Sequence, residues 1–208
     1  MGRSLIMDLS GLTLQLIAFR VLTLVIVAGI QGGIVAGAAV VLGDNGPKYD
    51  GRLTIVPAGH IDLVGAISTI VFGIGWTKPV AIDARQFRIG PIGPAVVILA
   101  GFVGILVTAA LLEALILPAL ATLPLTAGLT TAAFLRAASS LSIWFALLSL
   151  VPIPPLTGGL LLDALGIRVP RQARWIPAAA LLAAVATGLV HRLLGPAHAM
   201  LASVILGD

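Results

Sequence analysis

The chain has 208 residues, of which 59% are hydrophobic and 10% are charged, and its mean hydropathy of +1.15 excludes an ordinary soluble domain. It contains no cysteine, which excludes disulfides, thiolate zinc sites and iron–sulfur clusters. The net charge of +4 comes from scattered basic residues among few aromatic ones, so we expect the chain to contact a lipid bilayer and no nucleic acid.

Five apolar segments are predicted to form membrane helices, at residues 12–42, 61–76, 92–117, 130–150 and 175–194. As a helix, the first would be about 46 Å long, more than the roughly 30 Å hydrocarbon core requires, whereas the second is short for a span. The predicted fold class is therefore an α-helical polytopic membrane protein. We expect one integral membrane domain over residues 1–208, in a bacterial-type inner or plasma membrane.

Two polar connections between these segments are predicted to contain short strands. Asn45-Gly46-Pro47 marks a turn, and the following residues 52–57 alternate in polarity and include β-branched side chains. Residues 78–83 are similarly strand-like. Because the polar backbone of a strand cannot face lipid, we expect both strands to lie at the interface or to be paired within the protein.

Three blocks of sequence, at residues 43–62, 76–88 and 149–159, carry a family resemblance. They include His60-Ile-Asp62, Trp76-Thr-Lys-Pro-Val80 and Pro152-Ile-Pro-Pro-Leu-Thr-Gly158. In order and spacing, the blocks resemble the site-2 protease family (peptidase M50) of small intramembrane zinc metalloproteases over about residues 30–165. The resemblance implies a site-2 protease-like membrane fold and, in an active member, a zinc ion.

The residues that would bind and activate zinc in that family are replaced in this chain. The resemblance aligns the helical His-Glu-x-x-His motif of the family with Gln31, Gly32 and Val35, and a later aspartate ligand with Thr157. Valine and glycine side chains cannot bind a metal, and glutamine and threonine are poor zinc ligands. We therefore predict no catalytic residue, no metal ligand and no cofactor, with zinc expected only if the family activity were retained.

Several other residues of the family motifs are present, and we expect them to line a retained groove or to shape the loops around it. They are His60, Asp62, Trp76, Lys78, Pro79, Pro152, Pro155 and Gly158. His60, next to Asp62, is expected to be a satisfied interfacial residue and not a metal ligand.

Two features of the apolar segments have a structural and a functional interpretation. Gly29, Gly33 and Gly37 recur at every fourth residue, which predicts a close contact with a neighbouring helix. Arg20 and Glu113 are the charges deepest in apolar segments. We expect them to pair with each other or with Ser or Thr residues, and the alternative is a path for protons or a solute.

The sequence leads to one preferred function and two alternatives. The preferred function is a catalytically inactive site-2 protease-like protein that binds or scaffolds another membrane protein, a client or a partner subunit. The first alternative is an active intramembrane zinc metalloprotease with a non-standard site built on His60 and Asp62. The second is a small transporter or channel that uses Arg20 and Glu113.

Overall fold

The computed structural model describes residues 12–167, 170, 173 and 175–207, and this part of the chain is mainly helical. Its elements are α1 (Leu14–Val41), α2 (Gly46–Tyr49), η2 (Pro57–Gly59), α3 (Leu63–Phe72), η3 (Gly90–Ile92), α4 (Gly93–Ala114), α5 (Ile116–Thr122), α6 (Leu125–Leu150), η4 (Thr157–Gly159), α7 (Leu160–Ala164), α8 (Trp175–Ala186) and α9 (Leu189–Ile205).

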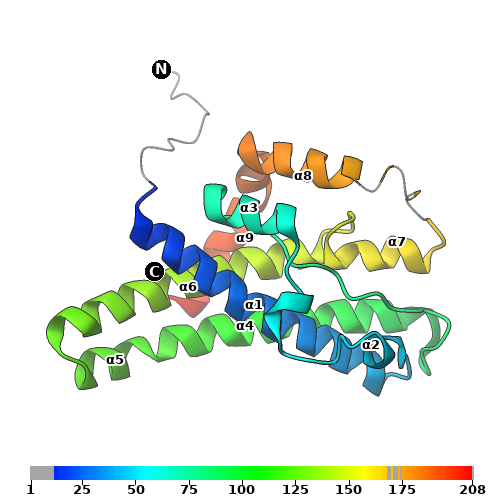
Figure 1. Ribbon diagram of the computed structural model, residues 1–208, viewed down its shortest axis with the longest axis horizontal. Helices are drawn as coiled ribbons and strands as arrows, with labels where there is room; N and C mark the ends of the chain where they lie inside the picture. The colour runs from blue at the N-terminus through cyan, green and yellow to red at the C-terminus, as the bar shows by residue number, and fades with distance from the viewer. Residues whose placement is uncertain (1–11, 168–169, 171–172, 174, 208) are drawn as a thin grey trace.

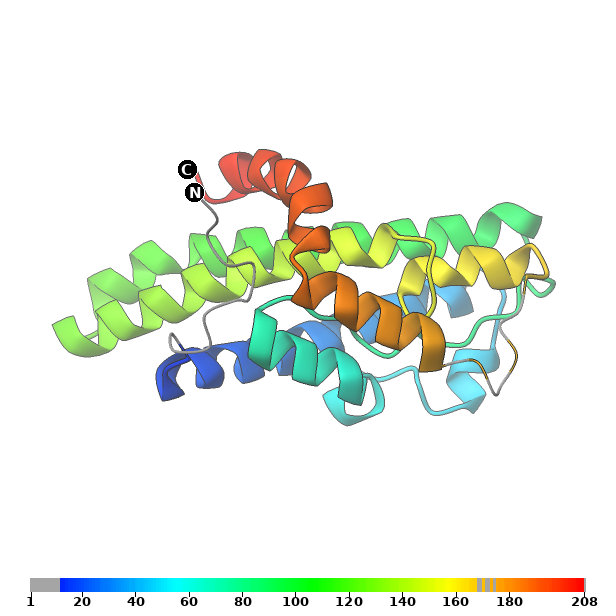
Figure 2. The same cartoon turned by 90° about the horizontal axis from the view of Figure 1, so that it is seen from above.

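The long helices α1, α4 and α6 pack side by side, and α3 and α8 lie together along one side of them (Figures 1 and 2). The α1–α4 contact is close because Gly101 and Gly104 of α4 have no side chain. A Cβ atom at Gly101 would lie 2.8 Å from a methyl group of Val35, and one at Gly104 would overlap Ile34. Small residues allow membrane helices to approach in this way, so these glycines allow α1 and α4 to pack closely.

In the described part of the chain, three helical segments are long and apolar enough to cross a membrane, namely Leu14–Val41, Gly90–Thr122 and Leu125–Leu150. Helices α8 and α9 meet at an angle of 71° and would count as a fourth crossing if they act as one broken span. The outward faces of these membrane-capable helices carry exposed leucine and valine side chains, as expected of helices in contact with lipid. The protein thus has the features of a multi-pass membrane protein.

The structure differs from the prediction of five membrane segments. The segment predicted at 61–76 forms only α3, a helix of 10 residues, which is about 15 Å long and too short to span the bilayer. It begins where Asp62 caps its N-terminus and ends at Gly73, whose φ of 73° is left-handed. The segment predicted at 175–194 is interrupted between α8 and α9, where Gly188 also has a left-handed φ of 72°.

The two predicted strands are not present within the described residues. Residues 52–56 and 78–83 are irregular, Pro57 begins η2, and one isolated antiparallel bridge joins Ile61 to Thr77. A short segment can alternate in polarity without forming a strand, because a ladder needs a partner of matching length. The segment 52–60 instead lies along the middle of α1.

Gly29 and Gly33 of α1 contact this segment and not a neighbouring helix. A Cβ atom at Gly29 would overlap the carbonyl oxygen of Ile55, and one at Gly33 would lie 3.1 Å from the Ile55 side chain. Gly37 has no such neighbour within 4 Å. The predicted helix–helix contact of these glycines is therefore wrong in its partner, although the close approach is real at two of the three positions.

Candidate functional site

The fold brings together two of the four motif positions that the family resemblance aligns with a zinc site. Gln31 from α1 and Thr157 from η4 line one small cavity of about 10 Å³, together with Ser149 near the end of α6. The complete lining is Gln31, Trp76, Thr77, Phe145, Leu148, Ser149, Leu156 and Thr157. The cavity has room for about one water molecule and contains no ionisable side chain in its lining.

Some of the polar side chains that line this cavity already make hydrogen bonds. The Thr77 hydroxyl donates to Oε1 of Gln31 at 2.9 Å, and the Ser149 hydroxyl donates to the carbonyl of Ala146 at 2.6 Å. Gln31 and Thr77 are both buried. The cavity therefore lies at a junction where α1 is joined to the 74–78 connection by a side-chain hydrogen bond.

Val35 and Gly32 are the other two motif positions. Val35 faces apolar side chains, and the space beside Gly32 is already occupied. Val35 is buried in a cluster that includes Val80, Phe87 and Val97. A Cβ atom at Gly32 would overlap the imidazole ring of His60, so the ring occupies the space that any side chain at position 32 would need. Neither position offers a group that could hold a metal or activate water.

His60 is fully buried and held from two sides. Its Nε2 lies 2.9 Å from the carbonyl oxygen of Thr54, so Nε2 carries the proton and Nδ1 is left as an acceptor without a partner among the described residues. Burial lowers the pKa of His60, the hydrogen bond to Thr54 opposes this shift, and the positive charge of Arg52 adds to it. His60 is thus a neutral packing residue against α1.

Asp62, Lys78 and Pro79 organise the loops around His60. One carboxylate oxygen of Asp62 accepts the Gly65 backbone N–H at 2.8 Å and so caps α3. The backbone N–H of Lys78 donates to the carbonyl of His60 at 2.8 Å, and the Arg52 guanidinium donates to the carbonyls of Lys78 and Pro79 at 3.1 and 3.3 Å. These motif residues shape the loops, and His60 and Asp62 make separate contacts.

The proline-rich loop closes the opposite wall of the cavity. Pro152 and Pro155 lie in the turn that follows α6, and the Pro154–Pro155 bond is cis. A Cβ atom at Gly158 would overlap the carbonyl of Val151, so the loop folds back tightly on itself. Trp76 is buried in the apolar cluster that also contains Leu156 of this loop.

No three side chains of histidine, cysteine, aspartate or glutamate gather into a metal-binding group within residues 12–167, 170, 173 and 175–207. The zinc ion implied by the family resemblance does not fit the residues present, because Gln31 is engaged by Thr77, Val35 lies among apolar side chains and Thr157 supplies only a neutral hydroxyl. These side chains are suited to hydrogen bonding and packing, and they do not support zinc chemistry at the cavity.

A known bacterial protein has clear similarity to the chain. The protein named "Putative zinc metalloprotease YwhC" of Bacillus subtilis (strain 168) is 30% identical over 148 residues, which are 70% of this chain and 68% of the relative. The chain belongs to the site-2 protease-like family. No family model and no solved structure matches it.

The deepest charges of this family member do not pair with each other. Arg20 donates to the carbonyls of Ile70 and Val71 at 2.6 and 2.9 Å, at the C-terminal end of α3. A cation is stabilised at this end of a helix, where unpaired carbonyls carry partial negative charge. The expected pairing of Arg20 and Glu113 with each other or with Ser or Thr residues is therefore wrong, because Arg20 bonds to backbone carbonyls and Glu113 to an arginine.

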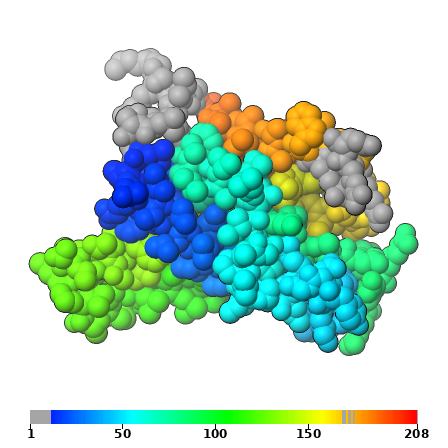
Figure 3. All heavy atoms as spheres, in the orientation of Figure 1, coloured from blue at the N-terminus to red at the C-terminus, as the bar shows by residue number. Residues whose placement is uncertain are grey.

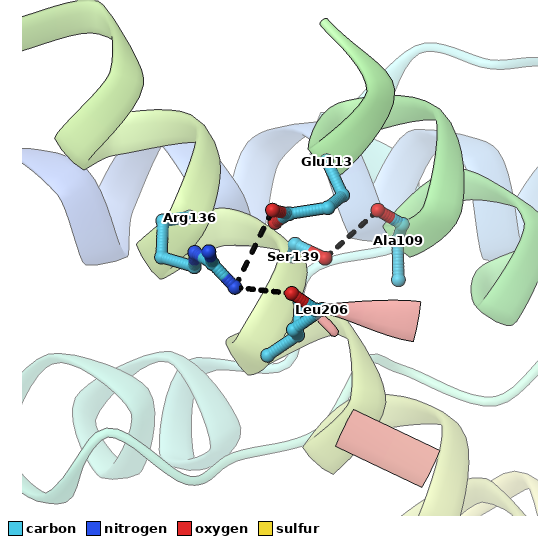
Figure 4. Close-up of polar contacts among 5 residues, drawn as sticks. All are labelled: Ala109, Glu113, Arg136, Ser139 and Leu206. Carbon is cyan, nitrogen blue, oxygen red and sulfur yellow. Dashed lines mark hydrogen bonds and ion pairs between the residues drawn. The ribbon is translucent and has the colours of Figure 1, made fainter. Parts of the chain in front are cut away.

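Glu113 of α4 pairs with Arg136 of α6, with 3.3 Å between Oε1 and Nη1 (Figure 4). The same nitrogen of Arg136 donates to the carbonyl of Leu206 at 2.8 Å, at the end of α9. Ser139 adds a hydrogen bond of 2.8 Å to the carbonyl of Ala109. This polar cluster joins α4, α6 and α9.

Thr77 and Arg136 are among the residues of these contacts that the sequence motifs did not point to. Thr77 lies between the motif residues Trp76 and Lys78, so its place inside a conspicuous block was a usable signal. For Arg136 the sequence offers no such signal, because its pairing with Glu113 depends on how α4 and α6 pack.

Proposed function

We propose that this chain is a catalytically inactive member of the site-2 protease-like family that binds another membrane protein without cleaving it. The observation that carries the proposal is the hydrogen bond from Thr77 to Gln31, inside a cavity with no imidazole or carboxylate in its lining. Zinc-dependent hydrolysis needs a ligand set with an open position and a base that activates the bound water. Neutral hydroxyl and amide groups at these positions favour hydrogen bonding over hydrolysis.

The geometry gives little support to a non-standard protease site on His60 and Asp62. His60 directs Nε2 to the Thr54 carbonyl and its ring to Gly32, whereas Asp62 caps α3. Zinc would require both to lie within about 2.0–2.2 Å of one ion, together with further ligands. Likewise, the contacts of Arg20 and Glu113 favour a structural role over a solute path.

The surface best suited to a client is the irregular segment 53–56, which lies over α1 on the face shown in Figure 3. Leu53, Ile55 and Val56 are 45%, 76% and 57% exposed. Among the described residues, the backbone N–H of Ile55 and the carbonyl of Leu53 have no hydrogen-bond partner.

The position of this segment explains why it would need a partner. Ile55 packs on Gly29 and Gly33, near the middle of a helix long enough to cross the membrane. Irregular backbone at that depth is tolerated only where protein covers it or water reaches it. An extended segment of a client could pair with the free groups and cover the apolar side chains, as in other cases of strand addition. The Bacillus relative favours a bacterial inner membrane as the location.

The client part of the proposal is tested by site-specific photocrosslinking in cells. A photoreactive residue at Ile55 is compared with one at Leu117 of α5, which is similarly exposed at 77% but lies far from segment 53–56 in the chain. We expect a position-specific crosslink from Ile55 to an uncut transmembrane segment of another protein. Equal labelling at both positions would refute client binding at this surface.

The catalytic part is tested by measuring metal content and cleavage with the purified protein. We expect less than stoichiometric zinc and no metal-dependent cleavage of a crosslinked client. As a comparison, the chain with Gln31→His, Gly32→Glu, Val35→His and Thr157→Asp carries the family residues, and we expect it to bind zinc poorly because His60 fills the space beside position 32. One tightly held zinc per natural chain, with client cleavage that a chelator stops, would refute inactivity.

A further inference from the structure

Three polar groups around the Gln31 cavity have no hydrogen-bond partner within the described part of the chain. The indole Nε1 of Trp76 is buried and unpartnered, and the Trp76 side chain is only 2% exposed. Among the described residues the Thr157 hydroxyl has no hydrogen-bond partner, and Gln31 accepts the Thr77 hydroxyl at Oε1 while its amide nitrogen has no acceptor. A buried N–H is rarely left without an acceptor, so the unpartnered indole of Trp76 favours a further partner in the cavity that Trp76 lines.

We propose that the cavity binds one ordered water molecule, which joins Trp76, Gln31 and Thr157 in place of the metal of the family. This inference rests on the proposed loss of zinc binding. The cavity volume of about 10 Å³ is about the space that a single water molecule needs. Its lining is neutral, which suits water and disfavours a cation.

The donors and acceptors of the cavity can supply three of the four hydrogen bonds of one water molecule. Water accepts two hydrogen bonds, and the indole N–H of Trp76 and the amide N–H of Gln31 can supply both. Water also donates two, and the Thr157 hydroxyl oxygen can accept one of them. Each partner thereby gains the bond that the protein alone does not provide.

The bound water would connect three parts of the chain that are distant in sequence. Gln31 belongs to α1, Trp76 to the connection that follows α3, and Thr157 to the loop that follows α6. In a family member with zinc, the resemblance implies that the metal joins α1 to the same loop. Here a neutral water would keep that link without supplying catalysis.

The energetic test is a double-mutant cycle on the purified full-length protein, read as the midpoint of thermal unfolding. Thr157→Val removes the hydroxyl at nearly constant shape, and we expect it to lower the midpoint by about 3–6 °C. In a Trp76→Phe background the same change should have less than half of that effect, because the water has already lost one partner. Thr108→Val is the matched control, since Thr108 is a buried threonine bonded to Gly104 within α4, and its effect should be additive with Trp76→Phe.

The water itself is tested by NMR of the indole N–H groups, of which the chain has three. We expect a cross-peak between the Trp76 indole proton and a long-lived water, absent in Thr157→Val. An additive cycle without this cross-peak would overturn the proposal, as would a midpoint that falls when a chelator removes a bound zinc. Client crosslinking from Ile55 is a separate readout, so failure of the water site can be distinguished from failure of client binding.

Discussion

The contact between Gly32 and His60 makes the effect of a single methyl group predictable. In Gly32→Ala, the new Cβ would overlap the imidazole ring, which is fully buried and held by Thr54 at 2.9 Å. The ring must move, and it then loses the hydrogen bond, which contributes about 1 kcal/mol. Overpacking in a closed site adds about 1–2 kcal/mol. We therefore expect Gly32→Ala to destabilise the protein by about 2–3 kcal/mol.

This change is measured as the thermal unfolding midpoint in detergent, where about 2–3 kcal/mol corresponds to a decrease of about 5–10 °C for a chain of this size. Gly37→Ala is the matched control, because it adds the same methyl group to the same helix where no neighbour lies within 4 Å. It should be neutral or slightly stabilising, since alanine favours a helix more than glycine does.

A second comparison isolates the imidazole ring as the cause. In a His60→Ala background the clash is absent, so Gly32→Ala should have an effect close to that of Gly37→Ala. If Gly32→Ala and Gly37→Ala are equal in the natural background, or if removal of the His60 ring leaves the cost of Gly32→Ala unchanged, the steric reasoning is wrong.

Three further predictions concern ionisable side chains. Because burial lowers the pKa of His60, the unfolded chain binds a proton near pH 6.5 that the folded chain does not. The free energy of unfolding should therefore be constant above this pH and fall as the pH decreases below it. Unfolding midpoints between about pH 8 and 5 measure this dependence, which should be weaker in His60→Asn. Arg20→Leu removes two hydrogen bonds to the end of α3 and should cost about 2–3 kcal/mol, while Arg20→Lys should retain part of the stability; equal stability of both variants would contradict the capping role. A double-mutant cycle of Glu113→Gln and Arg136→Gln should give a coupling of about 1 kcal/mol, and additivity would show that the pair contributes nothing.

Much of the membrane fold could be predicted from local sequence. Residues 12–42 contain one charge and no proline, and α1 runs over Leu14–Val41 close to that range. The predicted segment 130–150 ends at the same residue as α6, just before the prolines that begin at Pro152, because proline removes a backbone donor. The order of the motif blocks correctly indicated the family, which the similarity to the Bacillus relative supports.

Other elements could not be predicted because their length depends on contacts from elsewhere in the chain. The apolar segment 61–76 supports a helix over all of its length by composition, yet α3 stops at Gly73, where Arg20 of α1 binds its last carbonyls. Residues 52–57 have strand-like alternation, but their partner in the structure is the glycine face of α1. In both cases a side chain or surface that is distant in sequence determines the secondary structure of the segment.

The sequence by itself determined which chemistry is available at the candidate site, since it contains no cysteine and places Gln31, Val35 and Thr157 where the family resemblance expects metal ligands. Only the tertiary structure decided what those residues do. It brings Gln31 and Thr157 to one cavity, bonds Gln31 to Thr77 and places the His60 ring over Gly32. Such contacts join residues that are 28 to 126 positions apart in the chain, so they depend on how helices pack and not on local sequence preference.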